Sequence, residues 1–268
     1  MAPVLILQFM ADDAPAYLGT WLRRQGVDAD VRLAEGGSAF PDRIDGYRAL
    51  ALLGGSMSVN DGFAYLRTAE HLIDQAMARN VPVLGHCLGG QLMARTLGAK
   101  VGSSPSPEIG WQRIECAEAE ERTQWFGPEP MHHVFHWHYE AFDLPAGAAS
   151  LASSLACPHQ AFAIGPHLAL QFHVEVDDPK VRLWLSEGEA AYLEAQRHHD
   201  SVHGEQRLLH ARSDELVLFR EDRFAEKLRD TRDQLWLPQR AHWNIRQLLL
   251  QARGQLRILQ QALAPLLA

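Results

Sequence analysis

Short apolar runs recur along the first part of the chain. They are Pro3–Phe9, Ala49–Leu53 and Val81–Leu84, and Val27–Leu33 suggests a further strand. Polar or glycine residues bound each run, which is typical of a buried strand. Strands that are apolar on both faces occur mainly in parallel sheets covered by helices on both sides. The pattern therefore predicts four strands of a mostly parallel sheet.

Amphipathic stretches separate these runs. Ala14–Gln25, Tyr65–Arg79 and Gly89–Leu97 have apolar residues at helical spacing, and Gly26 is placed to end the first helix. The second stretch is predicted to bury one face made of Leu66, Ala69, Leu72, Ile73 and Ala76. Strands alternating with helices predict an α/β fold with three layers, in which helices flank a mostly parallel central sheet.

The pattern changes from Ile109 to about Phe172. Helical stretches are scarce there, and Ala161–Ile164 and Leu168–Phe172 are typical of hairpin strands. We therefore expect a β-rich edge attached to the α/β core.

The last part of the chain has a different composition. Pro179–Gln196 is predicted to be a helix, and the remainder is rich in Arg, Gln, Glu and Leu. Within it, Ala241–Leu263 has apolar residues at helical spacing. We predict a catalytic domain over residues 1–197 and a helical C-terminal extension of unknown role over residues 198–268.

Composition and charge argue against a nucleic-acid-binding protein and against a membrane protein. The chain has 268 residues, a formal net charge of −8 and a pI of about 5.9, which argues against nucleic-acid binding. No apolar run reaches the roughly 18 residues of a membrane span, and the N-terminus lacks the basic region of a signal peptide. The three cysteines are Cys87, Cys116 and Cys157, which form no CxxC pair and fit a reducing compartment. We expect a cytoplasmic protein that contacts neither nucleic acid nor membrane.

The segment Val81–Gln91 carries the strongest chemical signal. It places Cys87 between a buried strand and the following helix, with Gly85 and Gly89 on either side. Glycines permit the tight turn that holds the nucleophile in serine hydrolases. A thiolate at a helix N-terminus is stabilised there, and the Leu88 N–H can stabilise an oxyanion. A buried structural cysteine beside a tight turn is the alternative.

A base and its orienting group follow a later strand. His173 comes directly after an apolar run, and Glu175 lies two residues on, facing the same side if the strand continues. A histidine beside the thiol would hold it as an ion pair, and a carboxylate on its second nitrogen would fix the tautomer. Gly54 and Gly55 form another strand-end turn, whose backbone could supply a second oxyanion donor.

These motifs resemble those of class I, or triad-type, glutamine amidotransferases, and most strongly the stand-alone proteins that are similar to GMP synthase. The resemblance rests on Gly-x-Cys-x-Gly-x-Gln at 85–91, Gln-Phe-His-x-Glu at 171–175 and Gly-Gly-Ser at 54–56. Pro107–Trp111 and Phe135–Pro145 also look like that group. The match covers roughly residues 3–185.

The resemblance implies a Cys–His–Glu triad that hydrolyses the side-chain amide of glutamine through a γ-glutamyl thioester. By position, Cys87 would be the nucleophile, His173 the base and Glu175 its orienting group. It further implies oxyanion donors at Gly55 and Leu88. Gly54 and Gln91 would contact the substrate, and the backbone around Trp137 and His138 would hold its amino-acid end.

This chain departs from the pattern in two places near the triad and in its tail. It has His86 where many relatives carry an aliphatic residue, and Val174 where many carry proline. From about His198 onward no match is recognisable, so the resemblance assigns no acceptor for the ammonia.

Other signals are discounted. His132, His133, His136 and His138 cluster, but spacing alone supplies no further ligands, so no metal site is predicted. Phosphate-binding glycine loops are absent, so no cofactor is expected.

Three functions remain open. The first is glutamine hydrolysis that delivers ammonia to a separate synthetase subunit. The second is a free-standing hydrolase of another γ-glutamyl peptide or amine, and the third is a non-enzymatic binding protein on the same fold. The expected partners are glutamine or another γ-glutamyl small molecule and a synthetase chain, with a homodimer as a further alternative.

Overall fold

In the computed structural model, one nine-stranded sheet runs through the described part of the chain, in the order β2-β1-β3-β4-β9-β8-β7-β5-β6. The structure describes residues 2–34, 40–118 and 120–187, together with His199, Val202, Ile258, Gln260, Gln261 and Ala264. The strands are Val4–Gln8 (β1), Ala29–Leu33 (β2), Ala49–Leu52 (β3), Val83–His86 (β4), Val101–Cys116 (β5), Met131–Phe142 (β6), Ala149–Ser153 (β7), Ala161–Ile164 (β8) and His167–Leu170 (β9).

Five strands form the parallel half of the sheet. β2, β1, β3, β4 and β9 pair in parallel, and four helix-linked or long connections join them. Every residue of β1 is buried, and successive side chains enter different cores. Leu5 and Leu7 pack on one face, whereas Val4 and Ile6 pack on the other. The predicted covering of both faces explains why this strand is apolar throughout.

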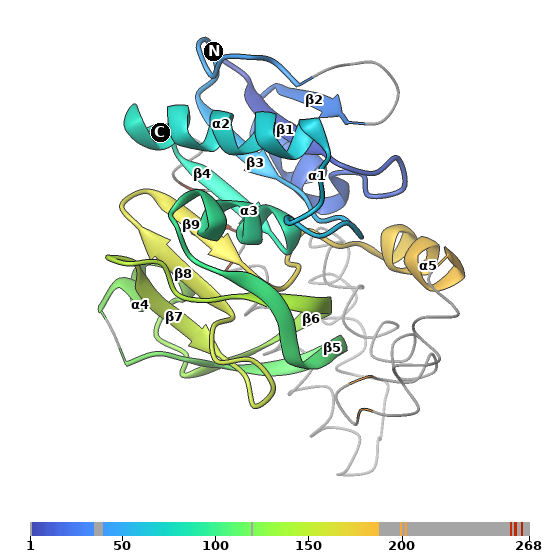
Figure 1. Cartoon of the computed structure of the whole chain (residues 1–268), viewed down its shortest axis with the longest axis vertical. Coiled ribbons are helices and arrows are strands. Elements are labelled where there is room, and N and C mark those ends of the chain that lie inside the picture. Colours follow the sequence, from blue (N-terminus) through green and yellow to red (C-terminus); the bar gives the residue numbers. More distant parts are fainter. Residues whose placement is uncertain are drawn as a thin grey trace, which may run out of the picture.

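Helices lie over both faces of the sheet, and one of them packs beside β7 in the antiparallel half (Figure 1). They are Ala16–Arg24 (α1), Ala64–Ala78 (α2), Leu88–Thr96 (α3), Glu120–Phe126 (α4) and Asp178–Glu187 (α5). Apolar residues of α2 and α3 pack on the face of Leu5 and Leu7, and those of α1 and α4 pack on the opposite face. The five residues predicted to form the apolar face of α2 are all fully buried. Burial of a leucine side chain contributes about 1.5–3 kcal/mol, so this face anchors the helix.

The antiparallel half continues the sheet beyond β9. β8, β7, β5 and β6 pair antiparallel, and the two longest strands, β5 and β6, form a ladder at the edge. The β-rich edge predicted from Ile109 is present, but it begins earlier, at Val101. Polar residues and prolines in the first part of β5 hide its strand character from the apolar pattern.

The α/β fold with its mostly parallel core is confirmed. The strand predicted over Val81–Leu84 lies two residues later in the structure, because β4 begins at Val83 and runs to His86. The helix predicted over Pro179–Gln196 is seen as α5 as far as Glu187. The rest of that helix and nearly all of 198–268 lie outside the described residues. No helix among the described residues is long and apolar enough to cross a membrane.

Candidate active site

Cys87 occupies a strained turn between β4 and α3. Its backbone has φ 48° and ψ −109°, a conformation that costs a residue other than glycine on the order of 1–3 kcal/mol. A Cβ atom on Gly85 would lie 2.5 Å from the carbonyl carbon of Gly89, and one on Gly89 would lie 2.5 Å from the Leu52 oxygen. The glycines predicted to permit a tight turn therefore allow α3 to pack directly on the sheet.

Several contacts hold this turn in place. The Cys87 N–H donates to the Leu170 carbonyl of β9 at 2.8 Å, and the Gln91 N–H donates to the Cys87 carbonyl at 2.9 Å. The thiol lies 3.8 Å from the Trp137 carbonyl and 3.8 Å from the Gln171 side-chain nitrogen. Cys87 is almost completely buried but borders a cavity. The sheet thus presents a thiol at the C-terminal end of β4, where parallel sheets bind ligands.

His173 and Glu175 meet beside this thiol. The imidazole Nδ1 lies 2.8 Å from a Glu175 carboxylate oxygen, which leaves Nε2 as the nitrogen for the thiol. The strand does not continue through these residues, because β9 ends at Leu170, so a shared strand face is not what aligns them. The His173 N–H instead donates to the Phe135 carbonyl of β6, and the Glu175 carbonyl accepts from the Tyr17 N–H of α1. Contacts with β6 and α1 therefore fix the two residues.

The opposite charges of His173 and Glu175 stabilise each other. Burial lowers the pKa of His173, but the Glu175 carboxylate and the hydrogen bond to Cys87 together raise it to about 10. Burial raises the pKa of Glu175, but the charges of His173 and Lys180 hold it well below its usual range. The imidazole is therefore favoured in its protonated form and the carboxylate in its ionised form.

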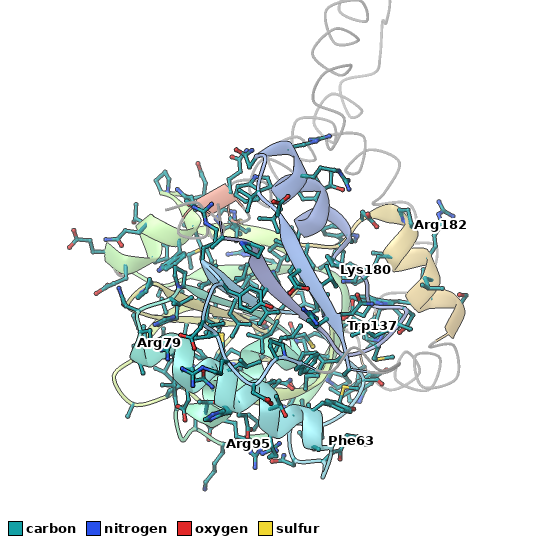
Figure 2. All side chains as sticks on the ribbon, turned by 90° about the horizontal axis from the view of Figure 1, so that it is seen from above. Phe63, Arg79, Arg95, Trp137, Lys180 and Arg182 are labelled. Carbon is teal, nitrogen blue, oxygen red and sulfur yellow. The ribbon has the colours of Figure 1, made fainter. Side chains whose placement is uncertain are left out.

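Lys180 supplies a fixed cation to the same group. Its ammonium lies 3.3 Å from a Glu175 oxygen, pairs with Asp13 and donates to the Ala14 carbonyl at 3.0 Å. Burial lowers the pKa of Lys180, but Asp13 and Glu175 raise it above its usual value. In Figure 2, Lys180 lies on the inner side of α5, whereas Arg182 points away from the protein. One face of α5 thus completes the charge balance of the site.

His86 also faces this group rather than open solvent. Its Nε2 lies 3.6 Å from the second Glu175 oxygen, and the side chain is fully buried. Burial lowers the pKa of His86 despite the nearby carboxylate, so the ring is favoured in its neutral form. The histidine at position 86, where many relatives carry an aliphatic residue, therefore contacts Glu175.

A cavity of about 670 Å³ adjoins the thiol. Cys87 and His173 line it, and so do four of the residues predicted to bind substrate or an oxyanion, namely Gly55, Gln91, Trp137 and His138. Gly54 lies just behind the thiol, since a Cβ there would be 3.0 Å from His173 Cε1 and 3.8 Å from Cys87 Cβ. Leu88 is the first residue of α3 and its side chain is buried, close to the position a Gly55 Cβ would take. The structure brings all these residues together.

The side chains of two residues in the predicted substrate site already contact other protein groups. The Gln91 amide nitrogen donates to the Glu140 carbonyl at 3.0 Å. The His138 Nε2 lies 3.2 Å from a Glu108 oxygen. Trp137 instead offers its carbonyl to the thiol and packs its ring against Trp184. Backbone atoms of β6 are therefore better placed than these side chains to contact a substrate.

Sequence reasoning missed three residues of the site. Asp13 lies in the turn before α1, and Lys180 and Trp184 lie on α5. The Trp184 ring packs edge-on against His173 with centroids 4.9 Å apart, and Lys180 lies 5.0 Å from the Trp184 ring. A polar turn and a helix with a mixed face carry no spacing that marks them. Only the packing of α5 and the Asp13 turn around Glu175 brings them in.

The other two cysteines differ from Cys87. Burial raises the pKa of both Cys116 and Cys157 to about 11, although a nearby Arg122 lowers that of Cys116 and a backbone hydrogen bond lowers that of Cys157. Neither lines the cavity. Both are therefore poor nucleophiles at neutral pH.

The family model described as glutamine amidotransferase class-I matches residues 21–180, more than half of the chain. The glutamine amidotransferase-like protein YfeJ of Salmonella typhimurium is 32% identical over 194 residues, covering 69% of this chain and 80% of that protein. One subunit of the glutamine-hydrolyzing GMP synthase of Thermoplasma acidophilum is 32% identical over 161 residues, covering 58% of this chain and 76% of that protein.

Solved structures are similar as well. A glutamine amidotransferase from Methylobacillus flagellatus superposes with a TM-score of 0.79 at 29% identity, covering 99% of this chain and 95% of that one. A glutamine amidotransferase from Thermotoga maritima superposes with a TM-score of 0.66 at 27% identity, covering 74% of this chain and 86% of that one.

Proposed function

Because the chain belongs to the class I glutamine amidotransferase family, whose members hydrolyse glutamine, we propose that it releases ammonia from glutamine through a Cys87–His173–Glu175 triad. One observation carries this proposal. A cysteine in a strained strand-to-helix turn shares a cavity with a histidine whose Nδ1 lies 2.8 Å from a buried carboxylate.

The first half-reaction forms a thioester. The Cys87 thiolate attacks the side-chain carbonyl carbon of glutamine, and the oxygen of the tetrahedral intermediate accepts from the N–H groups of Gly55 and Leu88. The His173 imidazolium gives its proton to the amide nitrogen, so that the C–N bond breaks and ammonia leaves. Glu175 holds the ring through Nδ1 and stabilises its positive charge until that transfer.

The second half-reaction restores the enzyme. His173, now neutral, takes a proton from water, and the resulting hydroxide attacks the thioester carbonyl. The C–S bond breaks, glutamate leaves and the thiolate–imidazolium pair forms again. Lys180 keeps Glu175 ionised throughout, because its ammonium lies 3.3 Å from the carboxylate.

The ammonia passes to a synthetase on another chain. This step of the proposal is supported by the resemblance to one subunit of a GMP synthase, since an enzyme named by its subunits has at least one more. The backbone of β6 at Trp137 and His138 would hold the amino-acid end of the substrate, with Gly54 and Gln91 beside the amide.

Glutamate release from glutamine tests the activity, and covalent labelling tests the site. A glutamine-like electrophile should modify Cys87, free glutamine should slow the labelling, and His173→Ala should nearly abolish it. Labelling at equal rates with and without glutamine would contradict glutamine as the substrate. Cys157→Ala serves as the matched control, because Cys157 is buried outside the cavity.

The size of the cavity favours a second candidate, hydrolysis of a larger γ-glutamyl peptide or amine. About 670 Å³ falls in the range that holds drug-sized ligands, which exceeds the needs of a single amino acid. A higher kcat/KM for γ-glutamyl amides than for glutamine, in the same Cys87-dependent assay, would identify this activity.

A further inference from the structure

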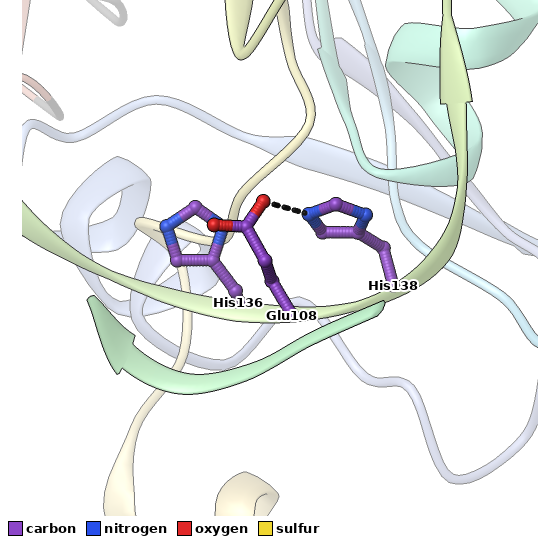
Figure 3. A group of neighbouring side chains, drawn as sticks. All are labelled: Glu108, His136 and His138. Atoms are coloured by element: carbon purple, nitrogen blue, oxygen red, sulfur yellow. Dashed lines mark ion pairs between the residues drawn. The ribbon is translucent and has the colours of Figure 1, made fainter. Parts of the chain in front are cut away.

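A second group of ionisable side chains lies in the antiparallel half of the sheet. Glu108 comes from β5, and His136 and His138 come from β6. Their ligand atoms all lie within 4.8 Å of one another, and all three residues are buried. Figure 3 shows the Glu108 carboxylate between the two imidazole rings. None of these side chains has a role in the triad.

The strand register builds this group. Glu108 pairs with His138 and Gly110 pairs with His136, so the three side chains occupy one face of the ladder. The position opposite His136 carries no side chain, because it is Gly110. The Glu108 carboxylate can therefore lean toward His136 as well as toward His138, whose Nε2 lies 3.2 Å from it.

We propose that Glu108, His136 and His138 bind a divalent transition-metal cation such as Zn²⁺. Two imidazoles and one carboxylate are ligands that zinc and iron(II) prefer, whereas Ca²⁺ and Mg²⁺ need more oxygens. Ligand atoms around a tetrahedral ion lie about 3.3 Å apart, since each bond is about 2.0–2.1 Å long. The Glu108–His138 pair already has that spacing, at 3.2 Å. Since no pair is more than 4.8 Å apart, the widest pair must close by at most about 1.5 Å.

Surrounding residues support a bound ion. Gln160 donates to the same Glu108 oxygen at 2.6 Å, as residues behind a metal ligand do to orient it. Gln160 also donates to Ser154 at 3.0 Å, so its amide is held in one orientation. Three protein ligands leave one coordination position for water. His138 borders the cavity of the thiol, which gives the ion a path from solvent.

Cobalt and zinc binding to the purified full chain tests the site. The chain also contains a thiol–imidazole pair, so each measurement is made on wild type and on Cys87→Ser. We expect wild type and Cys87→Ser to bind Co²⁺ with the visible bands of nitrogen and oxygen ligation and without a sulfur-to-cobalt charge-transfer band. His136→Gln should weaken Zn²⁺ binding, measured by competition with a coloured chelator, by about 100-fold or more.

Two further variants separate ligation from structural damage. Glu108→Gln should weaken binding as His136→Gln does, and His133→Gln should not, because His133 lies on the opposite face of β6. Zinc should raise the melting temperature of wild type and His133→Gln but not of the two ligand variants, with far-UV circular dichroism checking that they fold.

Three results would overturn the proposal. One is the loss of metal binding in Cys87→Ser, which would place the ion on the thiol. Another is unchanged affinity in both His136→Gln and Glu108→Gln, which would place the ion elsewhere in the chain. The third is the absence of Co²⁺ or Zn²⁺ uptake by the wild-type chain after removal of bound metal.

Discussion

Two buried carboxylates near the cavity, Glu175 and Glu108, each meet a histidine but in different surroundings. Glu175 lies behind the thiol beside His173 and has Lys180 as a fixed cation 3.3 Å away. Glu108 lies between two strands beside His138, and none of its ion pairs among the described residues involves a lysine or arginine. Burial raises the pKa of both carboxylates, and their partners more than offset it.

Because only one of the two carboxylates has a lysine beside it, they suit different chemical roles. The cation beside Glu175 keeps its charge fixed, so that His173 can gain and lose a proton while its orienting group stays ionised. The partners of Glu108 among the described residues are His136, His138, the Gln160 amide and the Ser154 hydroxyl, and none of them is a permanent cation. A bound cation would complete that balance, which is the basis of the metal proposal.

Removal of the Cys87 thiol should have the largest effect on glutamate release. It should act on the triad group of Cys87, His173 and Glu175 and not on the group around Glu108. Cys87→Ala should lower glutamate release on the order of 10⁶-fold, as loss of a nucleophile does in other triads. The Cys157 sulfur lies 3.5 Å from the His159 carbonyl, on the Glu108 side. Cys157→Ala should therefore leave glutamate release close to that of wild type. Equal losses in a glutaminase assay of the two variants would contradict the assignment of Cys87.

Neutralising each carboxylate compares the two groups directly. Glu175→Gln should lower kcat on the order of 10³- to 10⁴-fold, because the ring loses its orienting charge. Glu108→Gln should cause a much smaller loss. A pH profile adds a second readout, since the opposing effect of burial is outweighed by Glu175 and Cys87, which raise the pKa of His173 to about 10.

The sign of the pH effect follows from that shift. The imidazolium needed for ammonia departure is present below the folded pKa and is lost as pH rises through about 10. Without the Glu175 charge this pKa falls, so the alkaline limb of kcat/KM in Glu175→Gln should move to lower pH. The raised pKa of His173 also contributes to the free energy of unfolding. This contribution is fully present below the ordinary histidine pKa of about 6.5 and is lost as pH rises through the raised value. An alkaline limb at the same pH in both proteins would contradict the coupling.

Removing Lys180 should leave Glu175, like Glu108, without a permanent cation beside it. Lys180→Met leaves Asp13 and Glu175 buried without their shared cation, which should cost about 3–5 kcal/mol in the free energy of unfolding. Urea unfolding measures this cost. The double variant Asp13→Asn/Lys180→Met should recover part of it, because the buried Asp13 charge that has lost its cation is gone. A single variant as stable as wild type would show that Lys180 does not balance these carboxylates.

The smallest effect concerns the amide beside Glu108. Gln160→Leu removes the 2.6 Å hydrogen bond to the carboxylate and should lower the free energy of unfolding by about 1.5–3 kcal/mol. Gln124→Leu on the exposed surface of α4 is the control and should change it little. Equal thermal stability of the two variants would mean that the Gln160 hydrogen bond adds nothing to the second group.

The candidate site divides into residues that the sequence could place and residues that it could not. Cys87 with Gly85 and Gly89 was predictable, because the conformation of a tight turn depends on residues next to one another. The facing of His173 and Glu175 was expected from an extended strand, and the structure achieves it in an irregular segment held by Phe135 and Tyr17. Their closeness was foreseen, but for the wrong local reason.

The sequence by itself determined the parallel core, the buried face of α2 and the turn at Cys87, since apolar periodicity and glycine placement are properties of neighbouring residues. Only the tertiary structure decided that Lys180 and Asp13 would surround Glu175. It likewise decided that Glu108 would meet His136 and His138, through the register of β5 and β6. Such meetings depend on how distant segments pack, which no local spacing in the chain records.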